Sequence, residues 1–296
     1  MTRQPQIALL PDGRRLHLQD GPIDLIIQAK GREADVRAAY AAAARRFTGL
    51  LDELCAELPG LRKAAHPVHC PLQGVVARRM HAAVKPFAAD CFITPMAAVA
   101  GSVAEEVLGA MLAAAPLDRA YVNNGGDIAL HLGRGERFTV ALMDRLDRYG
   151  VMQTMVIDAR DPARGIATSG RHGRSFSLGI ADAVTVLART ASQADAAATI
   201  IANAVDLPGH PAVLRCAADS LQPDSDLGPR LVTREVGALS PAEIAAALDG
   251  GAACARHWLG AGLIEAAALR LSGETIIVGT KDVQRHSNVL HELAVA

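Results

Sequence analysis

The chain has 296 residues, of which half are hydrophobic and 3% aromatic, and its formal net charge is −1. A chain of this length can bury about three quarters of its extended surface, so it can form a large core. Counterion release on nucleic acid needs clustered Lys and Arg, and base stacking needs aromatic side chains. Because the basic residues here are scattered and aromatic residues are few, we expect no nucleic-acid partner.

The apolar stretches are too short or too interrupted to predict a membrane span. The longest one runs from Ala97 to Ala115, and Glu105 and Glu106 interrupt it. The N-terminal residues lack the apolar run of a signal peptide. The five cysteines are odd in number and not closely paired, which is typical of reduced thiols. We therefore expect a cytoplasmic protein that does not bind membranes.

The N-terminal part predicts a hairpin followed by a helix. Residues 6–30 alternate in polarity around Asp20-Gly21, which is typical of two strands joined by a turn. Apolar residues then recur at helical spacing over residues 32–58. Pro59-Gly60 is expected to end that helix.

The central part predicts one short helix, one long helix and a series of strands. Residues 61–95 indicate loops around a short helix near residues 75–84. A long Ala-rich helix is expected over about residues 96–115. Strand-like patterns follow at residues 121–122, 128–132, 138–142, 152–158, 166–169 and 183–188.

The last third predicts mixed elements. A helix is expected over about residues 192–205, and a strand over residues 231–236. Ser240 is the expected N-cap of a further helix that starts with Pro241. A final strand pair is expected within residues 265–278.

These elements predict an α+β fold in which antiparallel sheets pack with long Ala-rich helices. We expect a single domain over residues 1–280, whose C-terminal strand-helix-strand part covers about residues 206–280. Residues 281–296 are expected to form a flexible tail.

Asp195 and Thr199 are candidate metal ligands. Residues four apart share one face of a helix, so a carboxylate and a hydroxyl would lie side by side on a helix of small residues. Hard oxygen ligands of this kind suit Mg²⁺. The alternative is that Asp195 complements the dipole of its own helix and Thr199 packs through its methyl group.

Two short segments are candidate contacts to a phosphate or a ring. The turn of residues 123–127 contains two glycines, which let a backbone approach a ligand closely. Asn-Gly is equally the signal of an ordinary hairpin turn. Residues 168–170, with the sequence Thr-Ser-Gly, can offer hydroxyls and amides to a phosphate or can simply end a strand.

His66, His69 and Cys70 are side chains of the type that binds soft metals. A zinc site needs a second ligand cluster at suitable spacing, and the sequence contains no CxxC motif. Cys91 is a single further candidate. We therefore interpret these residues as part of a loop with incidental His and Cys.

Taken in chain order, these segments resemble the ApbE family, the FAD:protein FMN transferases. In that family an apolar helix of small residues leads to a strand, a Gly-Gly-Asp turn, a strand pair, a Thr-Ser-Gly strand and an Ala-Asp-Ala-x-x-Thr helix. The corresponding segments here are residues 97–115, 121–128, 167–170 and 194–199. The resemblance spans about residues 94–205.

The resemblance implies a flavin-nucleotide site with a metal ion. Asp195 and Thr199 would hold Mg²⁺ against the pyrophosphate of FAD. His172, as a candidate base, and Asp182 are the candidate catalytic side chains in the stretch where the family has its His-containing loop. The chain would transfer FMN from FAD to a Thr or Ser of an acceptor protein, or hydrolyse FAD to FMN and AMP. The implied contacts to FAD or FMN are Thr94, Met96, Ala97, Gly101, Asn124, Gly125, Gly126, Asp127, Thr168, Ser169 and Gly170.

The sequence departs from that family at two places. Residues 99–102 read Val-Ala-Gly-Ser where the family has Ala-Lys-Gly-Tyr, so the lysine is missing. The family's His-x-x-Asp-Pro-x-Thr-Gly loop is contracted to residues 171–182, where His172 and Asp182 do not match the motif. Two alternatives stay open: a non-catalytic flavin- or cofactor-binding protein of a redox or C1 pathway, and an enzyme on an unrelated small molecule. A homo-oligomer is compatible with each.

Overall fold

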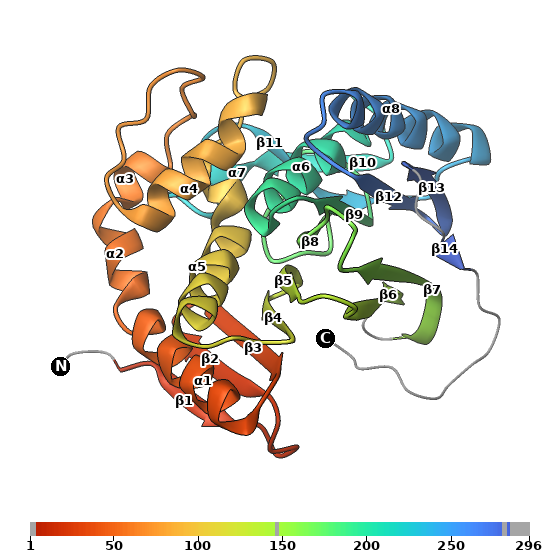
Figure 1. Cartoon of the computed structure of the whole chain (residues 1–296). Helices are drawn as coiled ribbons and strands as arrows, with labels where there is room; N and C mark the ends of the chain where they lie inside the picture. The colour runs from red at the N-terminus through yellow and green to blue at the C-terminus, as the bar shows by residue number, and fades with distance from the viewer. Residues whose placement is uncertain (1–3, 146–147, 280–282, 285–296) are drawn as a thin grey trace.

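A nine-stranded antiparallel sheet forms the centre of the protein (Figure 1). The computed structural model describes residues 4–145, 148–279 and 283–284, without the side chains of residues 141–154 and 283–284. In the large sheet the strand order is β1-β2-β3-β4-β5-β8-β9-β12-β13, and two smaller sheets accompany it. The combination of antiparallel sheets and separate helices confirms the predicted α+β class.

The strands follow the chain in mostly neighbouring pairs. The large sheet contains β1 (Gln6–Leu9), β2 (Leu16–Asp20), β3 (Ile23–Lys30), β4 (Arg119–Asn124), β5 (Asp127–Leu132), β8 (Gly165–Ser169), β9 (Ala183–Ala188), β12 (Ala266–Leu271) and β13 (Glu274–Val278). The smaller sheets contain β6 (Arg137–Arg145), β7 (Arg148–Asp158) and β14 (Val283–Gln284), and β10 (Val213–Ala217) and β11 (Leu231–Val236).

The helices lie between these strands in the sequence. They are α1 (Glu33–Phe47), α2 (Leu50–Ala56), α3 (Leu58–Leu61), α4 (Val75–Val84), α5 (Val99–Ala114), α6 (Ala191–Ala204), α7 (Ala218–Leu221) and α8 (Pro241–Gly260), with 3₁₀ turns η1 (Lys85–Phe87) and η2 (Pro95–Ala98). Figure 1 shows α5, α6 and α8 along the large sheet.

The prediction of one helix over residues 32–58 is wrong. The chain forms α1, α2 and α3 instead, because Gly49 adopts a left-handed φ of 84° and breaks the helical path after Phe47. Pro59-Gly60 does not end a helix, since both residues lie inside the short helix α3. Proline fits there because it occupies the first turn. The strand β10 and the short helix α7 were not predicted.

Other elements confirm the pattern-based predictions. The helix α4, the strand β9 and the strand β11 have the predicted bounds. Ser240 caps α8 through a capping box, in which Ser240 and Glu243 each bind the other's backbone N–H. The tail predicted for residues 281–296 lies outside the described residues, apart from β14.

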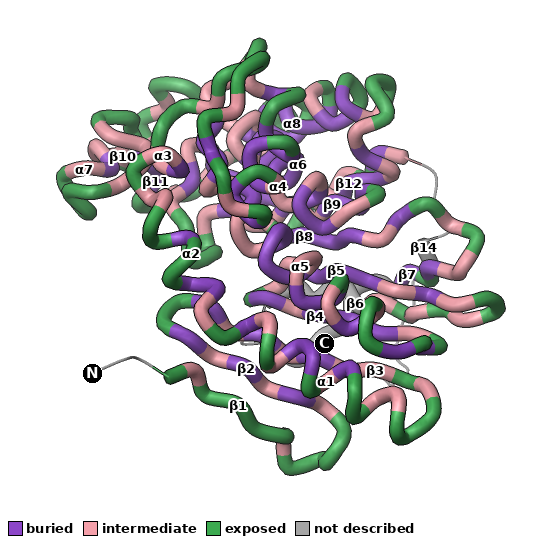
Figure 2. Tube along the Cα trace, turned by 60° about the vertical axis from the view of Figure 1, so that its left-hand side comes forward, coloured by how far each residue is buried: buried purple, intermediate pink, exposed green. Residues whose placement is uncertain are grey.

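Side chains alternate between two different cores across the centre of the sheet. On β5, Ile128 and Leu130 pack with residues of β6 and β7 on one face, whereas Ala129 packs in the main core with the helices on the other. Figure 2 shows this buried centre and the exposed outer strand β1. Since Asp127 is two residues before Ala129, alternation places it on the helix-covered face.

The helix α5 is the central helix of the main core. Together with η2 it forms Pro95–Ala114, which is the one stretch among the described residues that is long and apolar enough to cross a membrane. It packs instead against α1, α6, β4 and β5. Its two acids, Glu105 and Glu106, bind arginines of neighbouring helices. The apolar helix α5 is therefore part of the main core of the protein.

The N-terminal turns of α5 and α6 touch at Gly101. A Cβ atom at Gly101 would lie 2.3 Å from the carbonyl oxygen of Ala191, the first residue of α6. No side chain fits at that distance, so glycine is required for the two helix ends to meet.

We predict that Gly101→Ala destabilises the protein by about 1–3 kcal/mol or more, because the added methyl group must push α5 and α6 apart. Gly109→Ala is the matched control on the same helix. A Cβ at Gly109 meets no atom within 4 Å, so this change should stabilise by about 0.5–1 kcal/mol through helix propensity. Chemical denaturation measures both, and equal effects of the two variants would contradict the close contact.

Candidate functional site

Two aspartates from different elements meet near the N-terminus of α5. Asp127 is the first residue of β5, directly after the Gly125-Gly126 turn. Asp195 lies in the first half of α6. Both residues are half-buried.

Asp195 caps the neighbouring helix rather than its own. Its Oδ2 atom accepts a hydrogen bond from the backbone N–H of Gly101 at 3.0 Å. Gly101 is the third residue of α5, where backbone N–H groups have no partner within the helix. The alternative considered for Asp195 named the dipole of its own helix, whereas the helix end that it caps is that of α5.

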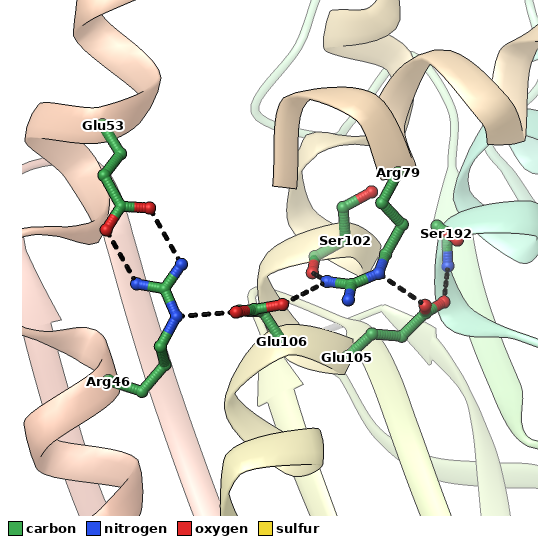
Figure 3. A network of polar contacts seen from close by, with 7 residues as sticks. All are labelled: Arg46, Glu53, Arg79, Ser102, Glu105, Glu106 and Ser192. Atoms are coloured by element: carbon green, nitrogen blue, oxygen red, sulfur yellow. Dashed lines mark hydrogen bonds and ion pairs between the residues drawn. The ribbon is translucent and has the colours of Figure 1, made fainter. Parts of the chain in front are cut away.

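The exchange is reciprocal. Glu105 on α5 accepts a hydrogen bond from the backbone N–H of Ser192, near the N-terminus of α6, at 2.7 Å (Figure 3). Thr190, the N-cap of α6, accepts another from the N–H of Gln193. Each helix thus supplies a carboxylate to the N-terminus of the other. These two bonds hold Asp195 against α5 and Glu105 against α6.

Two arginines neutralise the glutamates of this region. Arg79 on α4 lies 3.4 Å from Glu105 and 2.9 Å from Glu106, and Arg46 on α1 lies 2.6 Å from Glu106 (Figure 3). Burial acts to raise the pKa of Glu106, but the bonds from Arg46 and Arg79 outweigh it and leave this pKa below its ordinary value. Arg46 also binds Glu53. Glu106 is therefore stably ionised.

The aspartates show the opposite behaviour. Burial raises the pKa of Asp127 to about 7, while a bond from the backbone N–H of Thr168 at 3.2 Å acts in the other direction. Burial and then the negative charge of Asp127 raise the pKa of Asp195 well above its ordinary value. Among the described residues no cation is recorded as lowering either value. Two desolvated like charges of this kind mark a functional-site candidate.

The Gly-Gly turn has the geometry of a two-residue hairpin. Gly125 and Gly126 have φ angles of 66° and 112°, and the N–H of Gly126 binds the side chain of Asn123. The hairpin alternative is therefore confirmed for the turn. Asn124 is buried and donates to the carbonyl of Ala100 at 3.1 Å, which ties the turn to α5. The turn is thereby held beside the first residues of α5.

The Thr-Ser-Gly segment contributes differently along its length. The backbone N–H of Thr168 reaches Asp127, but its hydroxyl lies 2.9 Å from the hydroxyl of Thr185 on the neighbouring strand. Ser169 shares the strand face of the helix-packed Ala167. Gly170 is buried, and a Cβ there would lie 2.5 Å from the carbonyl of Asp182. Only Ser169 therefore has its side chain on the face of Asp127.

The side chains of residues 92–97, before α5, pack against other parts of the protein. The hydroxyl of Thr94 is buried and donates to Asp226 at 2.5 Å. Met96 and Ala97 are half-buried against the main core. Phe92 lies below the guanidinium of Arg230, whose Cζ atom is 3.2 Å from the ring centroid. The structure gives these residues a role in fixing the entry into α5.

The two residues expected to be catalytic do meet. His172 Nε2 lies 3.3 Å from Asp182 Oδ1, and His172 is exposed. The same carboxylate binds Arg171 at 2.6 Å, and its second oxygen accepts the N–H of Ser272 at 2.6 Å. Asp182 is therefore an anchor for the loop between β8 and β9.

The donor set around Asp127 and Asp195 fits a hard divalent cation. Thr199 lies one turn after Asp195 on α6 and is partly exposed, so its hydroxyl shares the face of the carboxylate. Mg²⁺ is usually bound by one or two carboxylates, with waters and phosphate oxygens filling the remaining positions. No group of three or more His, Cys, Asp or Glu that could hold a metal is found in the described part of the chain. The two-carboxylate arrangement is compatible with Mg²⁺, whereas a fully protein-made cage is not present among those residues.

Two other features lie apart from these residues. A cavity of about 600 Å³ is lined by Asp161, Pro162, Arg256, Leu259, Glu265, Val278 and Gly279, none of which was a predicted site residue. His66 accepts hydrogen bonds from the N–H groups of Val68 and His69, so it organises its own loop. These contacts agree with the interpretation of that loop as structural.

Sequence patterns missed two residues that contact the segments carrying the aspartates. In the sequence, Glu105 is only an interruption of an apolar run. Arg174 is only part of a contracted loop there, yet its guanidinium packs against Gly125. Helical spacing could not reveal either contact, because both join segments that are far apart in the chain.

Comparison with known proteins gives related sequences. A family model described as AbpE bacteria matches residues 7–277. A UPF0280 protein of Methanopyrus kandleri is 36% identical over 182 residues, which are 61% of this chain and 69% of that protein. UPF0280 proteins of Methanocella arvoryzae and Archaeoglobus fulgidus are each 36% identical, over 162 and 151 residues. These matches cover 54% and 50% of this chain, and 63% and 57% of the two relatives.

These findings correct the resemblance to the FAD:protein FMN transferases. The matched family is the one described as AbpE bacteria and the relatives are UPF0280 proteins, so the transferase family is the wrong assignment. The motifs behind it are short, and the structure gives each an ordinary role as a hairpin turn, a strand end or a helix cap. Such roles recur in unrelated proteins, so their order does not identify a family.

We predict that Asp127 makes stability depend on pH in buffer with a chelator. Its raised folded-state pKa means that, between about pH 4 and 7, the folded protein holds a proton that the unfolded chain has lost. Stability should therefore fall as pH rises through this window. In wild type the free energy of unfolding should fall by roughly 1–2 kcal/mol over this window, allowing for the partial exposure of the carboxyl. Asp127→Asn cannot titrate, so its free energy of unfolding should not show this fall.

Denaturation at pH 5 and pH 7.5 checks this, with the exposed helix residue variant Asp249→Asn as control. If the free energy of unfolding depends on pH in the same way in wild type and in Asp127→Asn, this carboxyl is not desolvated.

Proposed function

The chain belongs to the family described as AbpE bacteria, and we propose that it binds Mg²⁺ together with a phosphate-bearing ligand of the flavin-nucleotide class, FAD or FMN. Asp127, Asp195 and Thr199 would hold the metal, which would neutralise the phosphate charge when bound. The observation that supports this most is the pair of desolvated carboxylates, whose pKa values no cation of the described residues lowers.

The contrast between neighbouring acids supports the proposal. Glu105 and Glu106 lie one to two helical turns from Gly101, and both are paired with Arg79. The protein therefore neutralises acids near this site where they are structural. Asp127 and Asp195 retain repulsion that costs folding stability, and a divalent cation would relieve it. Stability lost at functional sites is a common trade-off.

The ligand class rests on the surroundings of the metal site. The glycine turn gives backbone access beside Asp127, and Ser169 offers a hydroxyl on the same sheet face. A flavin nucleotide carries both the phosphate that Mg²⁺ binds and a flat ring that a backbone of small residues can approach. We place this function in the cytoplasm, where the five free cysteines stay reduced.

Thermal unfolding with Mg²⁺ and FAD, each alone and together, tests the proposal. We expect stabilisation to be largest with both, and about 2.7 kcal/mol for a ligand at 100 times its Kd. Asp195→Asn and Asp127→Asn should lose most of this response, because each removes one metal-binding charge. Thr199→Val should lose a smaller part. The exposed variant Asp249→Asn should respond as wild type.

The same samples distinguish an enzyme from a binding protein. Release of AMP, with FMN left free or attached to an acceptor protein, would identify an enzyme. Bound flavin without turnover would support a flavin-binding protein. Stabilisation by Mg²⁺ with a phosphate compound but not with flavin would point to another small molecule. A wild type that responds to no combination of Mg²⁺ and phosphate ligand would reject the proposed function.

A further inference from the structure

Arg174 packs its guanidinium against the glycine turn that leads to Asp127. A Cβ atom built on Gly125 would lie 3.5 Å from Nη1, 3.6 Å from Cζ and 4.0 Å from Nε of Arg174. Three atoms of the planar group therefore lie at similar distances from the position where a side chain of residue 125 would begin. Gly125 has a left-handed φ of 66°, so the turn itself favours glycine at this position.

The loop that carries Arg174 is anchored immediately before it. Asp182 binds the Arg171 side chain, and the N–H of Arg171 donates to the carbonyl of Ala181 at 2.9 Å. The N–H of Gly173 then donates to the carbonyl of Gly170 at 3.0 Å, which closes a tight turn. Arg174 is thus held at a defined place over the β4–β5 turn.

The guanidinium of Arg174 keeps its hydrogen-bonding capacity. The other arginines near the site are paired: Arg171 with Asp182, and Arg79 with Glu105 and Glu106. Within the described ranges, no hydrogen bond or ion pair of Arg174 is recorded, and the side chain is exposed. A guanidinium has five N–H donors in a planar fork that matches two oxygens of a phosphate.

We propose that Arg174 is an anion-recognition residue of the site and binds a phosphate group of the ligand. This inference rests on the proposed function, since it adds the phosphate contact to the metal site of Asp127 and Asp195. The guanidinium of Arg174 lies over Gly125, and Asp127 follows two residues later, so one turn borders both the acidic and the basic side of the site. A phosphate between them would contact Mg²⁺ on one side and the fork on the other.

Binding of pyrophosphate, FMN and riboflavin in the presence of Mg²⁺ tests this, measured by calorimetry on the full chain. Arg174→Gln should weaken pyrophosphate and FMN binding about 10–100-fold, the usual loss for a hydrogen-bonded charge pair. Arg174→Lys should recover only part of the affinity, because it keeps the charge without the fork. Riboflavin has no phosphate, so any binding of it should be unchanged by either variant.

Arg234→Gln is the matched control, because Arg234 is an exposed arginine on β11 in the separate two-stranded sheet. Mg²⁺-dependent stabilisation without phosphate should persist in Arg174→Gln, because Asp127 and Asp195 are intact. If wild type binds pyrophosphate or FMN with Mg²⁺ and Arg174→Gln binds them equally well, the inference is wrong while the proposed function stands. If wild type binds neither ligand, both are rejected.

Discussion

The contact between the N-terminal ends of α5 and α6 is the constraint on which the candidate site depends. Gly101 lets the two helix ends meet, and each end is capped by a carboxylate from the other helix. This exchange satisfies backbone N–H groups that would otherwise lack partners in the core. It also fixes Asp195 on the sheet face that carries Asp127. A change in the angle between these helices would alter both caps and the spacing of the two aspartates.

The acidic residues of this region differ in their neighbours, and this difference distinguishes structural acids from candidate functional ones. Arg46 and Arg79 connect α1, α4 and α5 through Glu105 and Glu106, so those charges add to the rigidity of the helical layer. Asp127 and Asp195 have backbone N–H donors but repel each other. A rigid frame that holds two like charges together is the arrangement expected of a preorganised cation site.

Sequence patterns predicted most of the elements because their periodicity and caps are local. The capping box at Ser240 and the helix α4 are examples, since the signals lie within a few residues. The break at Gly49 was missed because helical spacing of apolar residues continues across it. For the site, i,i+4 spacing paired Asp195 with Thr199, and the Gly-Gly-Asp turn pointed to Asp127. The contacts of Asp195 with Gly101 and of Arg174 with Gly125 depend on tertiary packing, which short motifs do not encode. The same limit explains why the order of motifs suggested the wrong family.

A crystal structure with Mn²⁺, whose anomalous scattering identifies the ion, is the decisive test of a metal site at Asp127 and Asp195. We expect an anomalous peak at about 2 Å from carboxylate oxygens of both aspartates, with Gly101 still bound to Asp195. A structure in which Mn²⁺ binds elsewhere, while the two aspartates share a proton or pair with a basic side chain, would contradict it.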